Sequence, residues 1–178
     1  RSLDVARRGG TVAVSWSYYL LVTVHVLAAL LWLGGMFFLG VVGAPVLRAI
    51  EPPALRQRLF QELGLRFRSV GWISIAVLVT TGVLILHARG LLHWSGVFGS
   101  RDFWRTTFGT ALAWKLAAVT TMIVVSAVHD FMLGPAAGRA EPGSARAVSM
   151  RKHAAHLARL NAIVGLFLVA AAVRLARG

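Results

Sequence analysis

The chain has 178 residues, of which 57% are hydrophobic and only 14% charged, and it carries a formal net charge of +13 with no cysteine. This length suits a single domain, residues 1–178, and the absence of cysteine excludes disulfides, thiolate metal sites, iron–sulfur clusters and thiol catalysis. Most of the basic residues fall between long apolar blocks. We therefore expect them to contact lipid headgroups, and we predict no nucleic-acid partner.

Four apolar blocks are long enough to cross a lipid bilayer, which takes about 20 residues of helix. They cover roughly residues 16–44, 69–88, 106–129 and 154–175. The fourth has the shortest uncharged stretch, because only Leu160–Val173 lies between two arginines, whose long side chains must reach the headgroups. The pattern predicts an all-α fold, an integral membrane four-helix bundle.

The connections between the spans differ in composition. The first, Pro45–Arg68, carries five arginines and contains Pro52-Pro53, which predicts an interfacial amphipathic segment after the first helix. The compact arginine cluster also indicates that the first and third connections lie in the cytoplasm and that both termini are periplasmic. The third connection, Leu133–Ser149, is rich in Gly and Pro and predicts a loop.

Two polar side chains interrupt the apolar blocks. His25 is the only charged or histidine residue of the first block, and Lys115 lies within the third. A lysine in hydrocarbon costs roughly 2.5–3.5 kcal/mol, so such residues predict a partner, a cavity or a cofactor. Both lie nine residues into their spans from the same membrane surface, so we expect them at a common depth of about 13–14 Å. Two side chains placed in this way could provide the axial ligands of a haem iron.

Other interpretations of these residues stay open. His25 could be a hydrogen-bonded packing residue, and Lys115 could reach the interface or pair with a carboxylate such as Asp102. His87 or His93, near the same surface, could replace Lys115 as the partner of His25.

A second group of metal-ligating side chains gathers where the third span ends and the fourth begins. It comprises His129, Met132, Met150, His153 and His156. Imidazole and thioether groups bind copper, and imidazole also ligates haem. Solvated histidines at the membrane interface are the alternative.

Motifs of soluble enzymes are missing from the chain. It has no Gly-rich phosphate loop, no nucleophile elbow and no paired carboxylates within an apolar span. We therefore expect no hydrolase, whereas a haem-dependent oxidoreductase stays open and its catalytic residues unknown.

Several short motifs resemble the copper-resistance protein D (CopD) family. They are HVLAALLWLGGMFF at residues 25–38, Thr81-Gly82, Phe108-Gly109, Lys115-Leu116 and Arg159-Leu-Asn161. That family is associated with copper passage across the bacterial inner membrane, so the resemblance implies a multi-pass protein of that membrane. The chain is also similar to HemJ-type protoporphyrinogen oxidases, in which a first-helix His and a third-helix Lys are linked with b-type haem. His25 and Lys115 match those two positions.

The leading hypothesis is therefore a CopD-like membrane protein that binds b-type haem through His25, with Lys115 as second ligand, for electron transfer or redox chemistry. Copper transport or resistance through the second group of side chains is one alternative. A cofactor-free accessory subunit, packed against other subunits of a larger membrane complex, is another.

Overall fold

The computed structural model describes residues 2–92, 98–139 and 144–176, and within these ranges it contains helices and no strand. The elements in chain order are α1 (Ser2–Phe38), the π-helical turn η1 (Leu39–Gly43), α2 (Ala44–Arg48), α3 (Pro53–Ala88), α4 (Arg101–Arg105), α5 (Thr107–Ala127), the π-helical turn η2 (Val128–Leu133), α6 (Gly134–Arg139) and α7 (Ala145–Ala176).

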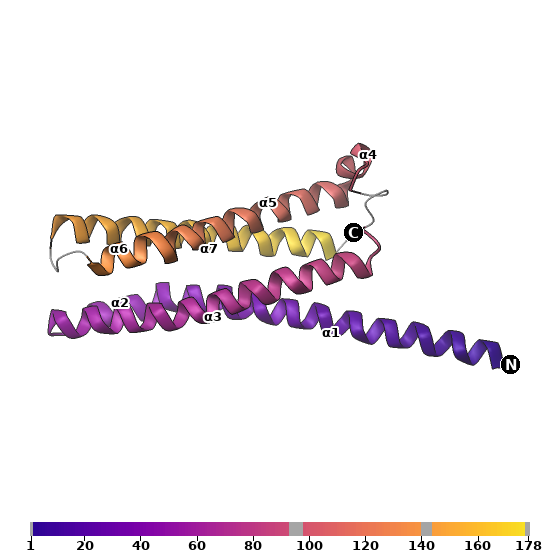
Figure 1. Ribbon diagram of the computed structural model, residues 1–178, viewed down its shortest axis with the longest axis horizontal. Helices are drawn as coiled ribbons and strands as arrows, with labels where there is room; N and C mark the ends of the chain where they lie inside the picture. The colour runs from indigo at the N-terminus through magenta and orange to yellow at the C-terminus, as the bar shows by residue number, and fades with distance from the viewer. Residues whose placement is uncertain (1, 93–97, 140–143, 177–178) are drawn as a thin grey trace.

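Four of the helical stretches are long and apolar enough to span a membrane. They are Trp16–Arg48, Pro53–Ala88, Thr107–Ala136 and Lys152–Arg174, which confirms the predicted all-α membrane bundle. Because the spans alternate in direction, residues 16, 88, 107 and 174 lie at one membrane surface, here called the terminal side. Residues 48, 53, 136 and 152 lie at the other, the far side. Both chain termini are at the right of Figure 1, on the terminal side.

Proline explains the two π-helical turns. Pro45 and Pro135 each follow a π turn by two residues, at the start of α2 and α6. A proline inside a helix lacks an N–H donor, and its ring collides with the carbonyl four residues earlier. A local widening of the helix accommodates the ring and lets both helices continue to the far side.

The corner between α4 and α5 depends on a cap and a glycine. The Thr106 side chain accepts a hydrogen bond of 3.0 Å from the Gly109 N–H, which satisfies one of the free donors at the start of α5. A Cβ atom at Gly109 would collide with the carbonyl group of Phe103. Only glycine lets the two helices approach this closely.

The bundle consists of two helical hairpins. α1 packs along α3 and α5 packs along α7, and Figure 1 shows them as two layered pairs. Trp32, Ile75 and Met122 form the buried centre of the core, and partly buried side chains from all four long helices pack around them. The core that joins the hairpins is therefore small.

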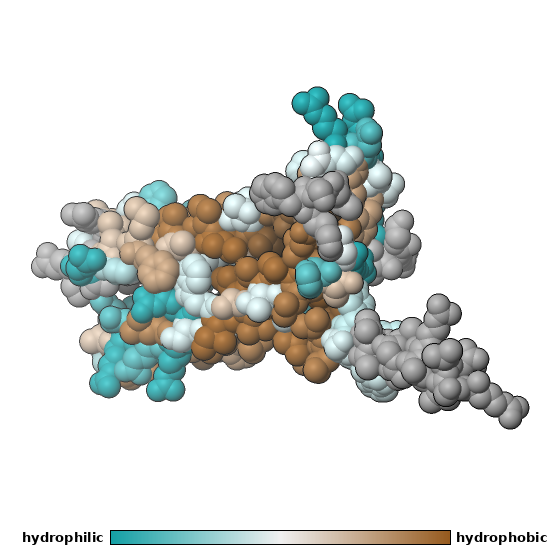
Figure 2. Space-filling model, turned by 45° about the vertical axis from the view of Figure 1, so that its right-hand side comes forward, coloured by the Kyte–Doolittle hydropathy of each residue, from teal (hydrophilic) through white to brown (hydrophobic). Residues whose placement is uncertain are grey.

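The outer surface of the bundle is apolar. Large side chains such as Leu27, Leu30 and Ile163 are mostly exposed. Figure 2 shows a hydrophobic belt around the middle of the molecule with hydrophilic groups towards its ends. Such a surface suits a lipid environment, in which apolar side chains need no burial by protein.

The connections differ in part from their predictions. A helix does start at Pro53, as Pro52-Pro53 indicated, but it is the first part of α3, which runs without interruption from Pro53 to Ala88. No proline or tight turn separates the arginine-rich part from the apolar part, so one helix of about 54 Å continues through both. The loop predicted for Leu133–Ser149 is largely helical, because α6 extends the third span to Arg139 and α7 starts at Ala145. Pro142-Gly143 lies outside the described residues.

Candidate functional site

His25 is half-buried on α1 and bonds across to α3. Its Nδ1 atom lies 2.8 Å from the hydroxyl oxygen of Thr81, and that hydroxyl lies 2.6 Å from the carbonyl oxygen of Val77. The Thr81 hydroxyl donates its one proton to that carbonyl, so its oxygen accepts from the Nδ1–H of His25. In this tautomer the lone pair of the ring is on the other nitrogen, Nε2. Thr81 itself is only 6% exposed.

Gly82 lies against the same imidazole ring. A Cβ atom at this position would lie 3.6 Å from Cε1 of His25, at ordinary contact distance. Thr81 therefore orients the imidazole by a hydrogen bond, and Gly82 packs against its ring without a side chain.

Lys115 approaches His25 from the other hairpin. It is half-buried on α5, within electrostatic range of His25 and of Arg89. No carboxylate among the described residues forms an ion pair with it, and Asp102 instead lies 3.8 Å from Arg105. Lys115 is thus within electrostatic range of His25, and Asp102 pairs with Arg105 and not with Lys115.

Arg89 closes the terminal side of this region, and its position was not predicted. Its Nε donates to the Tyr18 hydroxyl at 3.0 Å. Its guanidinium also lies 5.8 Å from the ring centroids of Tyr18 and Phe108. His87 is exposed in the last turn of α3, and His93 lies outside the described residues.

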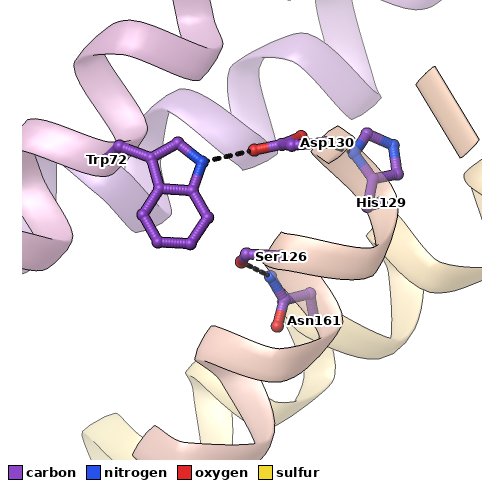
Figure 3. A network of polar contacts seen from close by, with 5 residues as sticks. All are labelled: Trp72, Ser126, His129, Asp130 and Asn161. Carbon is purple, nitrogen blue, oxygen red and sulfur yellow. Dashed lines mark hydrogen bonds and ion pairs between the residues drawn. The ribbon is translucent and has the colours of Figure 1, made fainter. Parts of the chain in front are cut away.

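A polar network occupies the far half of the bundle, as Figure 3 shows. Asp130, on η2, accepts a hydrogen bond of 3.0 Å from the indole Nε1 of Trp72 on α3. Its other oxygen lies 2.8 Å from Nδ1 of His129. Because a carboxylate only accepts, Nδ1 carries the proton and Nε2 of His129 is left uncommitted. Only Asp130 in this pair bridges to the other hairpin.

Asn161 and Ser126 form a buried pair beside this network. The Asn161 side-chain nitrogen donates to the Ser126 hydroxyl oxygen at 2.8 Å, between α7 and α5. The two residues are 5% and 7% exposed, and the Asn161 Oδ1 atom has no hydrogen-bond partner within the described part of the chain. An asparagine at the start of an apolar run is a signal for such a polar contact between helices, but it does not identify the partner.

The rest of the second predicted group is more dispersed. Met132 is 66% exposed, and the half-buried Met150 lies on α7. His153 is exposed and its Nδ1 lies 2.9 Å from the carbonyl oxygen of Ser149 on its own helix, and His156 is also exposed. In the described ranges, no three His, Cys, Asp or Glu side chains cluster as a metal site would require. A copper site that includes both methionines stays a prediction.

Comparisons with known proteins place the chain in a family. The family model described as copper resistance protein D matches residues 61–175, a segment that contains Thr81, Lys115 and Asn161 and begins after His25. A protein of Aquifex aeolicus (strain VF5), described as uncharacterized, is 31% identical over 158 residues, which cover 86% of this chain and 92% of the relative. No solved structure matches. The chain belongs to the copper resistance protein D family and is a multi-pass membrane protein.

Proposed function

We propose that this protein binds b-type haem through the Nε2 atom of His25, with Lys115 as second ligand, and serves electron transfer or redox chemistry in the bacterial inner membrane. The observation that carries the proposal is the bond from Nδ1 of His25 to Thr81. Histidines that bind a metal nearly always donate their other ring N–H to a fixed acceptor, which sets the tautomer and the ring orientation.

The residues present fit this group in two further respects. No side chain projects from Gly82 towards the imidazole, and a Cβ atom there would already be in contact with the ring. Lys115 offers a second nitrogen from the opposite hairpin, within electrostatic range of His25. Lysine is a less common haem ligand than histidine, since its amine must first lose a proton.

Each residue has a defined task in this proposal. His25 supplies the coordinating nitrogen, Thr81 holds it in the required tautomer, and the buried Trp32, seven residues further along α1, adds apolar surface on the side towards the core. Haem would supply a one-electron carrier, whose potential depends on its axial ligands and on the low dielectric around it.

Absorption spectra of the protein purified in detergent, oxidised and reduced, test the proposal. We expect a Soret band in the native protein and its loss in His25→Ala. His87→Ala is the matched control and is expected to retain the band, because His87 is exposed in the last turn of α3. A native protein without a Soret band, purified from cells supplied with haem precursor, would contradict the proposal.

Copper handling on the far side is a second candidate, favoured by the family and by the bond between His129 and Asp130. A carboxylate that orients a histidine is a common support for a metal ligand, and it leaves Nε2 free. Met132 and Met150 would add the thioether ligands suited to copper. Elemental analysis of protein from copper-fed cells tests this, with His129→Ala expected to lose bound copper and His25→Ala to keep it.

If neither haem nor copper is found in these two tests, the third candidate is a role without a cofactor. Protein without haem and copper that co-purifies with a larger membrane assembly would be an accessory subunit of that assembly.

We also propose that both termini are periplasmic. The chain has no cysteine, so a single introduced cysteine reports its own accessibility. In spheroplasts, a membrane-impermeant maleimide is expected to label Arg101→Cys on the terminal side and to leave Arg58→Cys on the far side unlabelled. The reverse pattern would invert the topology.

A further inference from the structure

A groove between α5 and α7 opens at the terminal side, on the outside of the bundle. It has a volume of about 450 Å³. Its lining includes Arg105, Thr107, Trp114, Phe167 and Arg174, together with three alanines. This volume is within the range of small-molecule sites.

The lining changes from charged to apolar with depth. Thr107 and Arg174 are the residues at which the third span begins and the fourth ends. Trp114 lies seven residues after Thr107, and Phe167 lies seven before Arg174. Seven residues of helix correspond to about 10 Å, so both aromatic rings lie at similar depth below the charged groups.

The apolar floor is formed by the two aromatic side chains. The rings of Trp114 and Phe167 meet edge to face, with centroids 6.4 Å apart and planes at 78°. Trp114 is 61% exposed despite its size. Ala111, Ala170 and Ala171 leave the space between the floor and the surface open. An extended apolar chain is the group that suits such a channel.

The charges at the mouth are available to an anion. Arg105 has one acidic neighbour, Asp102, at 3.8 Å, and both side chains are more than 80% exposed. An ion pair of this kind is worth little and is easily exchanged. The guanidinium groups of Arg105 and Arg174 can each form paired hydrogen bonds to a phosphate. The N-terminus of α5, with the Thr107 hydroxyl, adds donors and a positive dipole end.

We propose that this groove binds one anionic phospholipid. The phosphate lies between Arg105 and Arg174, and an acyl chain lies across Trp114 and Phe167. Positive charge at the headgroup level favours an anionic headgroup over a zwitterionic one, and the apolar floor distinguishes a lipid from a free phosphate. This assignment does not depend on haem or copper.

Lipid titration of the purified, delipidated full-length protein tests the proposal. Binding of phosphatidylglycerol, phosphatidylcholine with the same acyl chains, and glycerol phosphate is measured by native mass spectrometry in a neutral detergent. Two basic contacts near a membrane surface correspond to a preference of roughly thirtyfold. We expect phosphatidylglycerol to bind about that much more tightly than phosphatidylcholine, and glycerol phosphate to bind far more weakly than either lipid.

Variants then locate the site. Arg105→Gln/Arg174→Gln is expected to abolish the preference for phosphatidylglycerol, whereas Arg101→Gln, an exposed arginine on α4 that does not line the groove, retains it. Ala171→Phe, which fills the channel, is expected to weaken both lipids about tenfold, with the helical circular dichroism spectrum unchanged.

Three results would each overturn the proposal. Equal binding of the two lipids removes the role of the charges. Glycerol phosphate binding as tightly as the lipid makes the site a simple anion site. An unchanged preference in the double arginine variant places the lipid elsewhere.

Discussion

His25 and His129 use the same hydrogen-bonding arrangement in two different environments. Each donates Nδ1–H to a fixed oxygen, which leaves the lone pair of the ring on Nε2. Inside the membrane the acceptor is the neutral hydroxyl of Thr81, and near the far side it is the carboxylate of Asp130. A neutral acceptor avoids the cost of a buried charge, whereas a carboxylate needs water or further donors, and Trp72 provides one.

The two proposals assign different metal chemistry to these two histidines. A neutral histidine in an apolar pocket suits a haem iron, whose macrocycle brings its own charge compensation. A histidine supported by a carboxylate at the membrane edge suits a free copper cation. The following predictions test whether the two regions differ in this way.

The largest expected effect is a loss of stability when Asp130, in the far half of the bundle, is replaced. Asp130→Ala leaves the Trp72 indole N–H and the His129 Nδ1–H without their acceptor, and bonds to a charged group contribute about 1.5–3 kcal/mol. We expect the free energy of unfolding, measured by denaturant titration in detergent micelles, to fall by about 2–3 kcal/mol. His87→Ala should change it by less than about 0.5 kcal/mol. If Asp130→Ala is as stable as His87→Ala, the network has no structural role.

The second-largest effect is expected on haem affinity when Thr81 is replaced. Thr81→Val removes the acceptor of the His25 Nδ1–H while keeping the side-chain shape, and loss of such a support typically costs a metal site 10- to 100-fold in affinity. A haem titration followed by absorbance should show that loss, and Thr81→Ser should restore most of the affinity. Copper binding on the far side should stay unchanged. Equal haem affinity in Thr81→Val and the native protein would show that the bond to His25 is only a packing contact.

The smallest effect on stability is expected when the buried side-chain amide of Asn161 is removed. Asn161→Ala removes one hydrogen bond to Ser126, and such bonds between membrane helices are worth about 0.6 kcal/mol on average. Both Asn161→Ala and Asn161→Leu remove the buried Oδ1 that has no partner among the described residues. Asn161→Leu should be less destabilising than Asn161→Ala, because it keeps the volume filled. The same denaturant titration measures both. A loss above about 2 kcal/mol in Asn161→Leu would point to a role for the amide beyond packing.

The sequence predicts the spans well and their continuations poorly. Four apolar runs identify four membrane helices, because bilayer thickness fixes their minimum length. The same runs do not reveal that α3 begins at Pro53 instead of near Ser69, since a charged amphipathic stretch can lie along the membrane or continue straight out of it. Helical α6 was missed because Gly134 and Pro135 are read as breakers, whereas the preceding π turn accommodates the proline.

The candidate sites show a similar division. His25 and Lys115 stand out because a polar group within an apolar run is costly. Ala28 and Trp32, three and seven residues after His25 on the same helix, are both buried. The sequence does not predict which partners these residues meet, because this depends on how the helices rotate against one another. Examples are Thr81 beside His25, Tyr18 beside Arg89 and Trp72 beside Asp130. Asp130 reaches Trp72 from a π turn, which shifts the register of the helix face.

Haem stoichiometry in matched histidine variants tests the central claim most directly. The native protein, His25→Ala and His129→Ala are reconstituted with haem in detergent, and bound haem per chain is determined from the pyridine haemochrome spectrum. The proposal predicts about one haem per chain in the native protein and in His129→Ala, with none in His25→Ala. Full haem binding by His25→Ala, or its loss only in His129→Ala, would contradict it.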